Sequence, residues 1–145
     1  MSKVEFYRCE SCGNLVALMK EAKGELTCCN QPMTKLEANV SDAAEEKHVP
    51  HVVEEEDVIR VSVGSTIHPM LPEHYIEWIA LATDNEIIIK HLKPGEHPVV
   101  EFENVKDGTV FAYCNLHDLW KKDLQYIIPN EVVCSPEFPD GCISV

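Results

Sequence analysis

The sequence predicts an all-β fold in which a small cysteine-rich metal segment precedes an antiparallel β-sandwich. Four of the seven cysteines lie within the first 29 residues. The later part of the chain contains several short runs rich in β-branched and aromatic residues, with turn signals between them. The long crossover helices that an α/β fold requires are missing, so hairpin-connected strands in a sandwich are expected.

The bulk composition is that of a globular protein with one ordinary domain, or a small domain joined to a modest one. The chain has 145 residues, of which 45% are hydrophobic and 26% are charged. Its first residues, MSKVEFYRCE, contain no apolar signal region, and no run approaches the roughly 18 apolar residues of a membrane helix. We therefore expect a cytoplasmic protein with no membrane partner.

The formal charge limits the partners further. Acidic residues outnumber basic ones by 25 to 12, which gives a formal charge of −13. A phosphate backbone or an anionic membrane surface would be repelled by this charge. Nucleic acid is therefore not an expected partner.

Residues 1–36 predict a first unit that cannot fold on its apolar core alone. Three short strand-like runs, VEFYRC, NLVALM and GELTCC, are separated by Gly13 and Gly24. A segment of this length buries too little apolar surface and needs a covalent or metal staple. The next stretch, residues 37–47, is acidic and has no apolar periodicity, which indicates a linker.

The cysteines of this first unit indicate a metal site. Cys9 and Cys12 form a CxxC pair, and Cys28 and Cys29 are adjacent. An odd total of seven cysteines without an export signal favours metal over disulfides. Four thiolates suit tetrahedral iron or zinc, and a structural zinc knuckle stays an alternative. Two neighbouring cysteines must bend to face one ion, so we expect a distorted tetrahedron with no vacant position.

Residues 48–129 carry the pattern of the sandwich. In the run VIRVSVG at 58–64, Ile59, Val61 and Val63 alternate with residues of the other face. Similar strand-like runs follow at 75–83, 86–92, 98–105, 108–114 and 124–129, with turn signals at Asp84-Asn85, Pro94-Gly95 and Asp107-Gly108.

Residues 130–145 are rich in proline and are interpreted as a tail. It contains Cys134 and Cys142. A disulfide, an oligomer contact and free thiols all remain open for this pair.

A second group of possible metal ligands lies after the linker, where all seven histidines are found. Prolines in the HPMLPEH loop can fold it back and bring two imidazoles together. His51, His91 and His97 are expected to be ordinary surface or core histidines. Imidazole and thiolate suit zinc, copper, iron or nickel, and spacing does not choose among them. The alternative is that these side chains sit separately in loops. The candidates are His48, His68, His74, Cys114 and His117.

Five stretches together resemble the two-iron superoxide reductases of the desulfoferrodoxin type. They are FYRCESCGNLV, CCNQPM, EEKHVP, GSTIHPMLPEHYIEWI and CNLHDLW, and the resemblance covers about residues 1 to 128. It implies a desulforedoxin-like domain with iron held by Cys9, Cys12, Cys28 and Cys29. It also implies an immunoglobulin-like sandwich whose second iron has four equatorial histidines, His48, His68, His74 and His117, and axial Cys114.

The resemblance has two local departures. Asp118 and Asn30 stand where glycine is common in the family. Neither departure removes a ligand, but Asp118 changes the local charge beside His117.

The resemblance implies one-electron reduction of superoxide to hydrogen peroxide at a ferrous centre with an open position. Lys47 would draw in the anion, and Glu46 would close onto ferric iron once the product has left. A rubredoxin-like protein would supply electrons, and the family suggests a homodimer. The alternatives are a non-catalytic iron or zinc electron-carrier or binding module, and a dismutase.

Overall fold

The structure is a computed structural model that describes residues 4–40, 45–64, 68–105, 107–124, 132–134 and 142–144. At 45–46, 132–134 and 142–144 the description covers the backbone alone. Across these ranges, none of the helices combines the length and the apolar character needed to cross a membrane.

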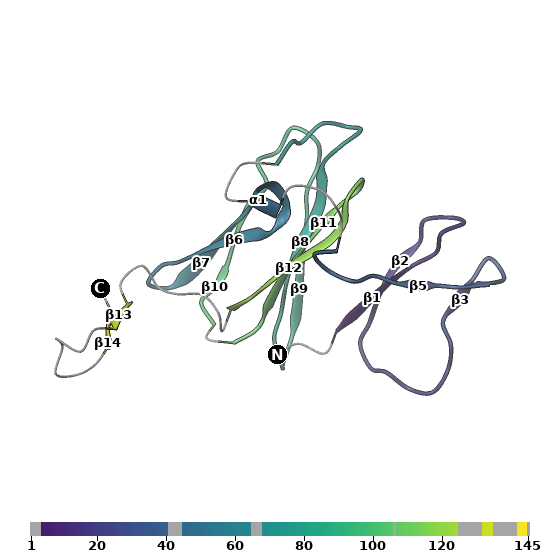
Figure 1. The fold of residues 1–145 in the computed structure, drawn as a ribbon, viewed down its shortest axis with the longest axis horizontal. Helices are drawn as coiled ribbons and strands as arrows, with labels where there is room; N and C mark the ends of the chain where they lie inside the picture. Colours follow the sequence, from purple (N-terminus) through teal and green to yellow (C-terminus); the bar gives the residue numbers. More distant parts are fainter. Residues whose placement is uncertain are drawn as a thin grey trace.

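The N-terminal unit is a small sheet with an added hairpin (Figure 1). Strand β1 (Glu5–Arg8) lies between β2 (Leu15–Leu18) and β5 (Thr34–Lys35), and both neighbours are antiparallel to it. Strands β3 (Thr27–Cys28) and β4 (Gln31–Pro32) form the hairpin. The three strands expected here are present, whereas β4 and β5 are too short to leave a pattern in the sequence.

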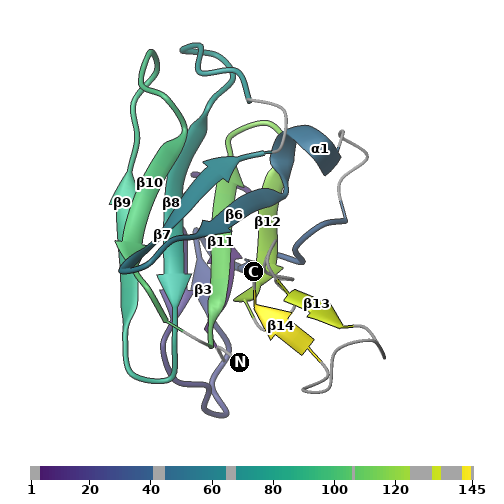
Figure 2. The ribbon, with the colours of Figure 1, turned by 90° about the vertical axis from the view of Figure 1, so that its left-hand side faces the viewer.

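Two antiparallel sheets form the larger unit, as the strand pattern predicts (Figure 2). The three-stranded sheet has the order β10-β7-β6, and the four-stranded sheet has the order β12-β11-β8-β9. The strands are β6 (Pro50–Glu54), β7 (Val58–Val63), β8 (Ile76–Ala82), β9 (Ile87–His91), β10 (Val99–Glu103), β11 (Thr109–Cys114) and β12 (Asp118–Asp123).

The main core lies between these sheets. Ile59, Val61 and Val63 of β7 are buried and Arg60 is exposed, which confirms the predicted alternation. Each fully buried aliphatic side chain of this kind contributes about 2 kcal/mol of transfer free energy. The facing sheet contributes a run of apolar residues from β8 and β11.

Strand β11 is buried on both of its faces. Val110, Ala112 and Cys114 belong to the core between the sheets. Phe111 and Tyr113 point to a second core that also contains Phe6 of β1. The N-terminal unit therefore covers the outer face of the four-stranded sheet, and a residue next to Cys114 lies at the contact between the two units.

Three elements between residues 45 and 124 differ from the sequence-based expectation. Strand β6 and strand β12 were not predicted, and the linker interval ends in a four-residue helix, α1 (Glu45–His48). Strand β12 has no recognisable strand pattern because its sequence DLWKKD is mostly charged and only Leu119 and Trp120 are buried. Of the strand expected at 124–129, all residues but Leu124 lie outside the described part of the chain.

Within the expected tail interval, two short strands pair. Strand β13 (Val132–Cys134) is antiparallel to β14 (Cys142–Ser144), and Cys134 is opposite Cys142 in the register.

Candidate metal centres

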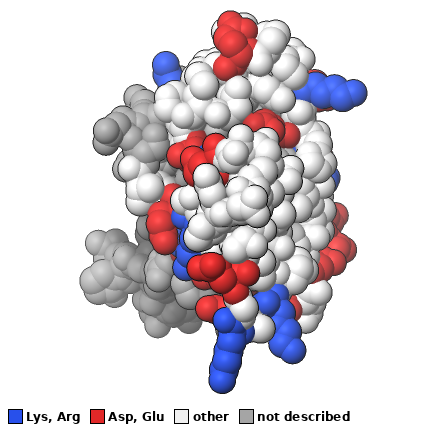
Figure 3. Space-filling view, turned by 90° about the vertical axis from the view of Figure 1, so that its right-hand side faces the viewer, with Lys and Arg blue, Asp and Glu red and all other residues white. Residues whose placement is uncertain are grey.

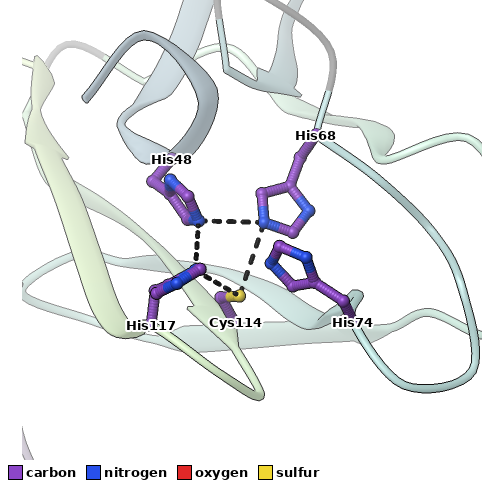
Figure 4. A group of neighbouring side chains, drawn as sticks. All are labelled: His48, His68, His74, Cys114 and His117. Atoms are coloured by element: carbon purple, nitrogen blue, oxygen red, sulfur yellow. Dashed lines mark hydrogen bonds between the residues drawn. The ribbon is translucent and has the colours of Figure 1, made fainter. Parts of the chain in front are cut away.

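Three separate parts of the larger unit supply one cluster of side chains (Figure 4). His48 is the last residue of α1, His68 and His74 come from the loop before β8, and Cys114 and His117 flank the turn from β11 to β12. One donor atom from each residue lies within 4.8 Å of all the others. We call this set the histidine/cysteine cluster.

The closest approaches in the histidine/cysteine cluster surround a common centre. His48 Nε2 lies 3.0 Å from His68 Nε2 and 3.1 Å from His117 Nδ1. Cys114 Sγ lies 3.4 Å from His68 Nε2 and 3.8 Å from His117 Nδ1. Donor atoms gathered this way suit a single ion.

His68 is held in the form that a metal requires. Its side chain is buried, and its Nδ1 lies 2.6 Å from the Pro69 carbonyl oxygen. Donation from Nδ1–H to this carbonyl leaves the Nε2 lone pair directed at the cluster. Burial lowers the pKa of His68 to about 4, so the imidazole is neutral at pH 7. Pro69, noted in the sequence as a loop breaker, thus also orients the ligand before it.

His74 gives the clearest geometric indication that this site suits a metal ion. Its loop reverses through a pair of backbone hydrogen bonds between Leu71 and His74, of 2.9 and 3.0 Å. His74 Nε2 is buried, and it has no hydrogen-bond partner among the described residues. An orphaned buried polar atom is costly, and a metal ion at the cluster would satisfy it.

The 114–118 turn is held by residues that the sequence analysis did not single out. Trp120 Nε1 donates to the His117 carbonyl at 2.9 Å. The Tyr75 backbone N–H donates to the Asn115 side-chain oxygen at 2.9 Å, which joins this turn to the loop that carries His74. No spacing rule reveals such support, because each bond uses a backbone group as one partner.

Cys114 is a buried sulfur in a site that needs a cation. Burial raises the pKa of its thiol, while the backbone N–H groups of Leu116 and His117 donate to the sulfur and work in the opposite direction. A thiolate at this depth requires a positive partner. The N and S donor set and the burial therefore fit a bound transition metal.

Two more residues expected at this site, Lys47 and Glu46, precede His48 in α1. His48 packs against Trp120, with ring centroids 4.8 Å apart, and neighbouring Lys47 is exposed. The charge of Lys47 contributes, after burial and His117, to the lowered pKa of His74, which places the ammonium within electrostatic reach of the cluster. The side chain of Glu46 lies outside the described residues.

The other histidines behave as ordinary surface residues. His51, His91 and His97 are exposed and lie outside the histidine/cysteine cluster, as the sequence indicated.

The four cysteines of the N-terminal unit form a second cluster, the four-cysteine cluster. Cys9, Cys12, Cys28 and Cys29 place their sulfurs within 4.8 Å of one another. Cys9 is buried, whereas Cys12 and Cys29 are exposed. The Cys12 N–H donates to Cys9 Sγ and lowers the pKa of Cys9 to about 6. The thiols of Cys12 and Cys9 raise the pKa of Cys28 to about 12, and a cation among the four sulfurs would favour its thiolate form.

Left-handed backbone conformations bring the adjacent cysteines to one side. Cys29 has φ 53° and Asn30 has φ 61°, and Gly13 after the CxxC pair has φ 85°. Asparagine tolerates this region better than most residues, which explains how Asn30 replaces glycine here. The bending that two neighbouring ligands require is therefore built from consecutive positive φ angles.

Comparisons with known proteins match both units. The model of the family "Desulfoferrodoxin, N-terminal domain" matches residues 1–36, and that of "Desulfoferrodoxin" matches residues 40–123. A desulfoferrodoxin from Clostridium acetobutylicum is 47% identical over 121 residues, which are 83% of this chain and 97% of that protein. A superoxide reductase from Pyrococcus horikoshii is 36% identical over 100 residues, covering 55% of this chain and 87% of the relative.

A solved structure is also similar in fold. The crystal structure of the superoxide reductase from Treponema pallidum aligns with a TM-score of 0.66 and 32% sequence identity. The alignment covers 83% of this chain and 98% of that one. Both clusters of this chain lie within the ranges that the two family models match.

Proposed function

Because the chain belongs to the desulfoferrodoxin family, we propose that it is a superoxide reductase, an enzyme that reduces superoxide by one electron to hydrogen peroxide. Its two clusters are the metal sites typical of desulfoferrodoxin irons. The observation that carries the function is the convergence of four histidines and one cysteine, with donor atoms within 4.8 Å of one another.

We assign His48, His68, His74, Cys114 and His117 as ligands of the catalytic iron, and Cys9, Cys12, Cys28 and Cys29 as ligands of the other. Ferrous iron bound at the histidine/cysteine cluster would supply the electron that superoxide accepts. Four neutral imidazoles and one thiolate leave a formal charge of about +1 with a divalent ion, which favours an anionic substrate. The lowered pKa of His68 and the orphaned His74 Nε2 support this assignment.

The protein's own groups prepare the site for an anion. The N–H groups of Leu116 and His117 stabilise the Cys114 sulfur as a thiolate. Lys47, exposed at the end of α1, attracts superoxide toward the cluster. Glu46 precedes it in α1, and we propose that its carboxylate approaches the site after peroxide leaves.

Reduction consumes one electron at each turnover, so the protein needs a donor. We propose a small rubredoxin-like protein that meets the four-cysteine cluster, where Cys12 and Cys29 are exposed. Figure 3 views the molecule from the side of the N-terminal unit and shows uncharged surface between acidic groups, with basic side chains at the edges. Such a surface suits a transient partner with few fixed ion pairs.

The remaining assignments rest on the family resemblance for the homodimer and on the sequence pattern for the location and the domain ranges. We propose a cytoplasmic homodimer, divided into the desulforedoxin-like domain at 1–36, the linker at 37–47, the sandwich at 48–129 and the tail at 130–145. The family models at 1–36 and 40–123 support the first and third of these ranges.

Product stoichiometry tests the function against its rivals. The reduced protein is mixed with superoxide under anaerobic conditions, and peroxide and oxygen are both measured. We expect one peroxide per superoxide consumed, no oxygen from superoxide, and an end to turnover when the electron donor is exhausted. Oxygen release at half the superoxide consumed would indicate a dismutase, and the absence of rapid oxidation would indicate a non-catalytic electron carrier.

A further inference from the structure

One arginine side chain joins the surroundings of both clusters. Arg8 directly precedes Cys9. Its Nη1 donates to the Tyr113 hydroxyl at 3.0 Å and to Asp118 Oδ1 at 2.5 Å. Tyr113 directly precedes Cys114, and Asp118 directly follows His117. The guanidinium of Arg8, the residue before Cys9, therefore bonds to the residues next to two ligands of the histidine/cysteine cluster, Cys114 and His117.

Further contacts hold Tyr113 and Arg8 in place. The Tyr113 ring stacks on Trp78 at 5.7 Å with an interplanar angle of 11°, and Trp78 in turn contacts Phe6 at 5.1 Å. Arg8 Nε also pairs with Glu10 at 2.9 Å, which fixes the plane of the guanidinium. The Arg8 side chain is 21% exposed and that of Asp118 is 44% exposed, so water and ions screen the pair in part.

Asp118 gains from Arg8 in two ways. Its φ is +65°, a conformation that glycine adopts without strain and that aspartate adopts at a cost. Its carboxylate also stands one residue from His117, where an unpaired negative charge would repel an incoming anion. The bond to Arg8 holds the strained residue and neutralises that charge.

We propose that Arg8 is a positioning residue of the histidine/cysteine cluster, which it acts on from the N-terminal unit by holding the 113–118 turn and cancelling the charge of Asp118. The consequence for superoxide rests on the proposed function, but the effect on the bound metal does not. The sheet that carries Arg8 thereby stabilises the other site through one ion pair across the contact between units.

The test uses the full chain with iron in both sites. Arg8→Met removes the charge and the hydrogen bonds to Tyr113, Asp118 and Glu10 while keeping an unbranched apolar stem. Asp118→Gly removes the carboxylate and the strain. The double variant completes a cycle, and Arg60→Met is the matched control because Arg60 pairs with Glu101 at 2.9 Å in the three-stranded sheet. Two properties of the histidine/cysteine iron are measured: its rate of loss to a chelator and its midpoint potential.

In Arg8→Met we expect iron loss from the histidine/cysteine cluster to rise about two- to fivefold, the factor that a partly exposed ion pair supplies. The midpoint potential should fall, because an uncompensated Asp118 carboxylate favours the ferric form. Against an Asp118→Gly background, Arg8→Met should change both properties less than it does in wild type, because only the bond to Tyr113 remains to be lost. Arg60→Met should leave both properties at the wild-type values.

Unchanged iron loss and potential in Arg8→Met would overturn the proposal, as would an equal effect with and without Asp118. If Arg8→Met does not fold, Arg8→Lys tests the same claim, because it keeps the charge but loses the fork that reaches Tyr113 and Asp118 together. Arg8→Lys should then keep the potential near wild type and still speed iron loss. A failure of the superoxide stoichiometry would leave these two readouts intact, so the two proposals fail separately.

Discussion

Removal of the Lys47 ammonium should slow the capture of superoxide. Lys47 is exposed and directly precedes buried His48. Its charge contributes to the lowered pKa of His74. At about 6 Å and an effective dielectric constant of about 20, one positive charge attracts an anion by roughly 3 kcal/mol. Because hydration and salt screen an exposed ammonium, we discount this to about 1 kcal/mol, or about a fivefold change in rate.

The assay is rapid mixing of the reduced protein with superoxide at several ionic strengths. Lys47→Ala should have a second-order rate constant about fivefold below wild type at low salt. Its dependence on ionic strength should also be weaker than that of wild type. Lys35→Ala is the matched control, since Lys35 carries the same charge on β5 and pairs with Glu5 at 2.7 Å. Equal rates in Lys47→Ala and Lys35→Ala would refute the role of Lys47.

Three further predictions follow from the site. In the metal-free protein, the pKa of His68 is lowered from 6.5 to about 4. Between pH 6.5 and about pH 4 the unfolded chain therefore binds more protons than the folded one. The free energy of unfolding falls as the pH drops through this range. Urea unfolding should show a loss of up to about 3 kcal/mol between pH 7 and pH 4, and a flat profile would contradict the buried neutral imidazole. Cys29→Ser should remove iron from the four-cysteine cluster while the spectrum of the histidine/cysteine iron persists, and loss of both spectra would argue against separate sites. Trp120→Phe removes the hydrogen bond to the His117 carbonyl and should lower the free energy of unfolding by about 1 kcal/mol. Iron should also leave the histidine/cysteine cluster faster. Unchanged stability would mean that this bond does not hold the turn.

Strands with one buried face could be predicted from the sequence, and strands with mixed surroundings could not. The alternation in β7 is plain because Ile59, Val61 and Val63 face the core and Arg60 faces water. In β12 the charged residues outnumber the buried pair Leu119 and Trp120, so no period-two pattern appears. The packing of the N-terminal unit on the outer face of β11 depends on distant Phe6, and local pattern does not carry that information.

The candidate site was also predictable only in part. Ligand types and spacing indicated two metal sites, and the structure brings those side chains together. Spacing left the choice of metal open, and it did not reveal Asn115 or Arg8, whose contacts join residues far apart in the chain. Nor did it reveal Trp120, whose indole N–H donates to a backbone carbonyl. Asp118 and Asn30 attracted notice as replacements for glycine, and their positive φ angles supply the physical reason that glycine suits both positions.

The most direct test of the central claim is the metal content per chain together with the visible spectrum. Both are measured for wild type and Cys114→Ser, in the oxidised and reduced forms. We predict two irons per wild-type chain with separate thiolate absorptions, one of which disappears in Cys114→Ser while the absorption of the four-cysteine iron remains. Stoichiometric zinc in the histidine/cysteine cluster, or a Cys114→Ser spectrum identical to wild type, would contradict it.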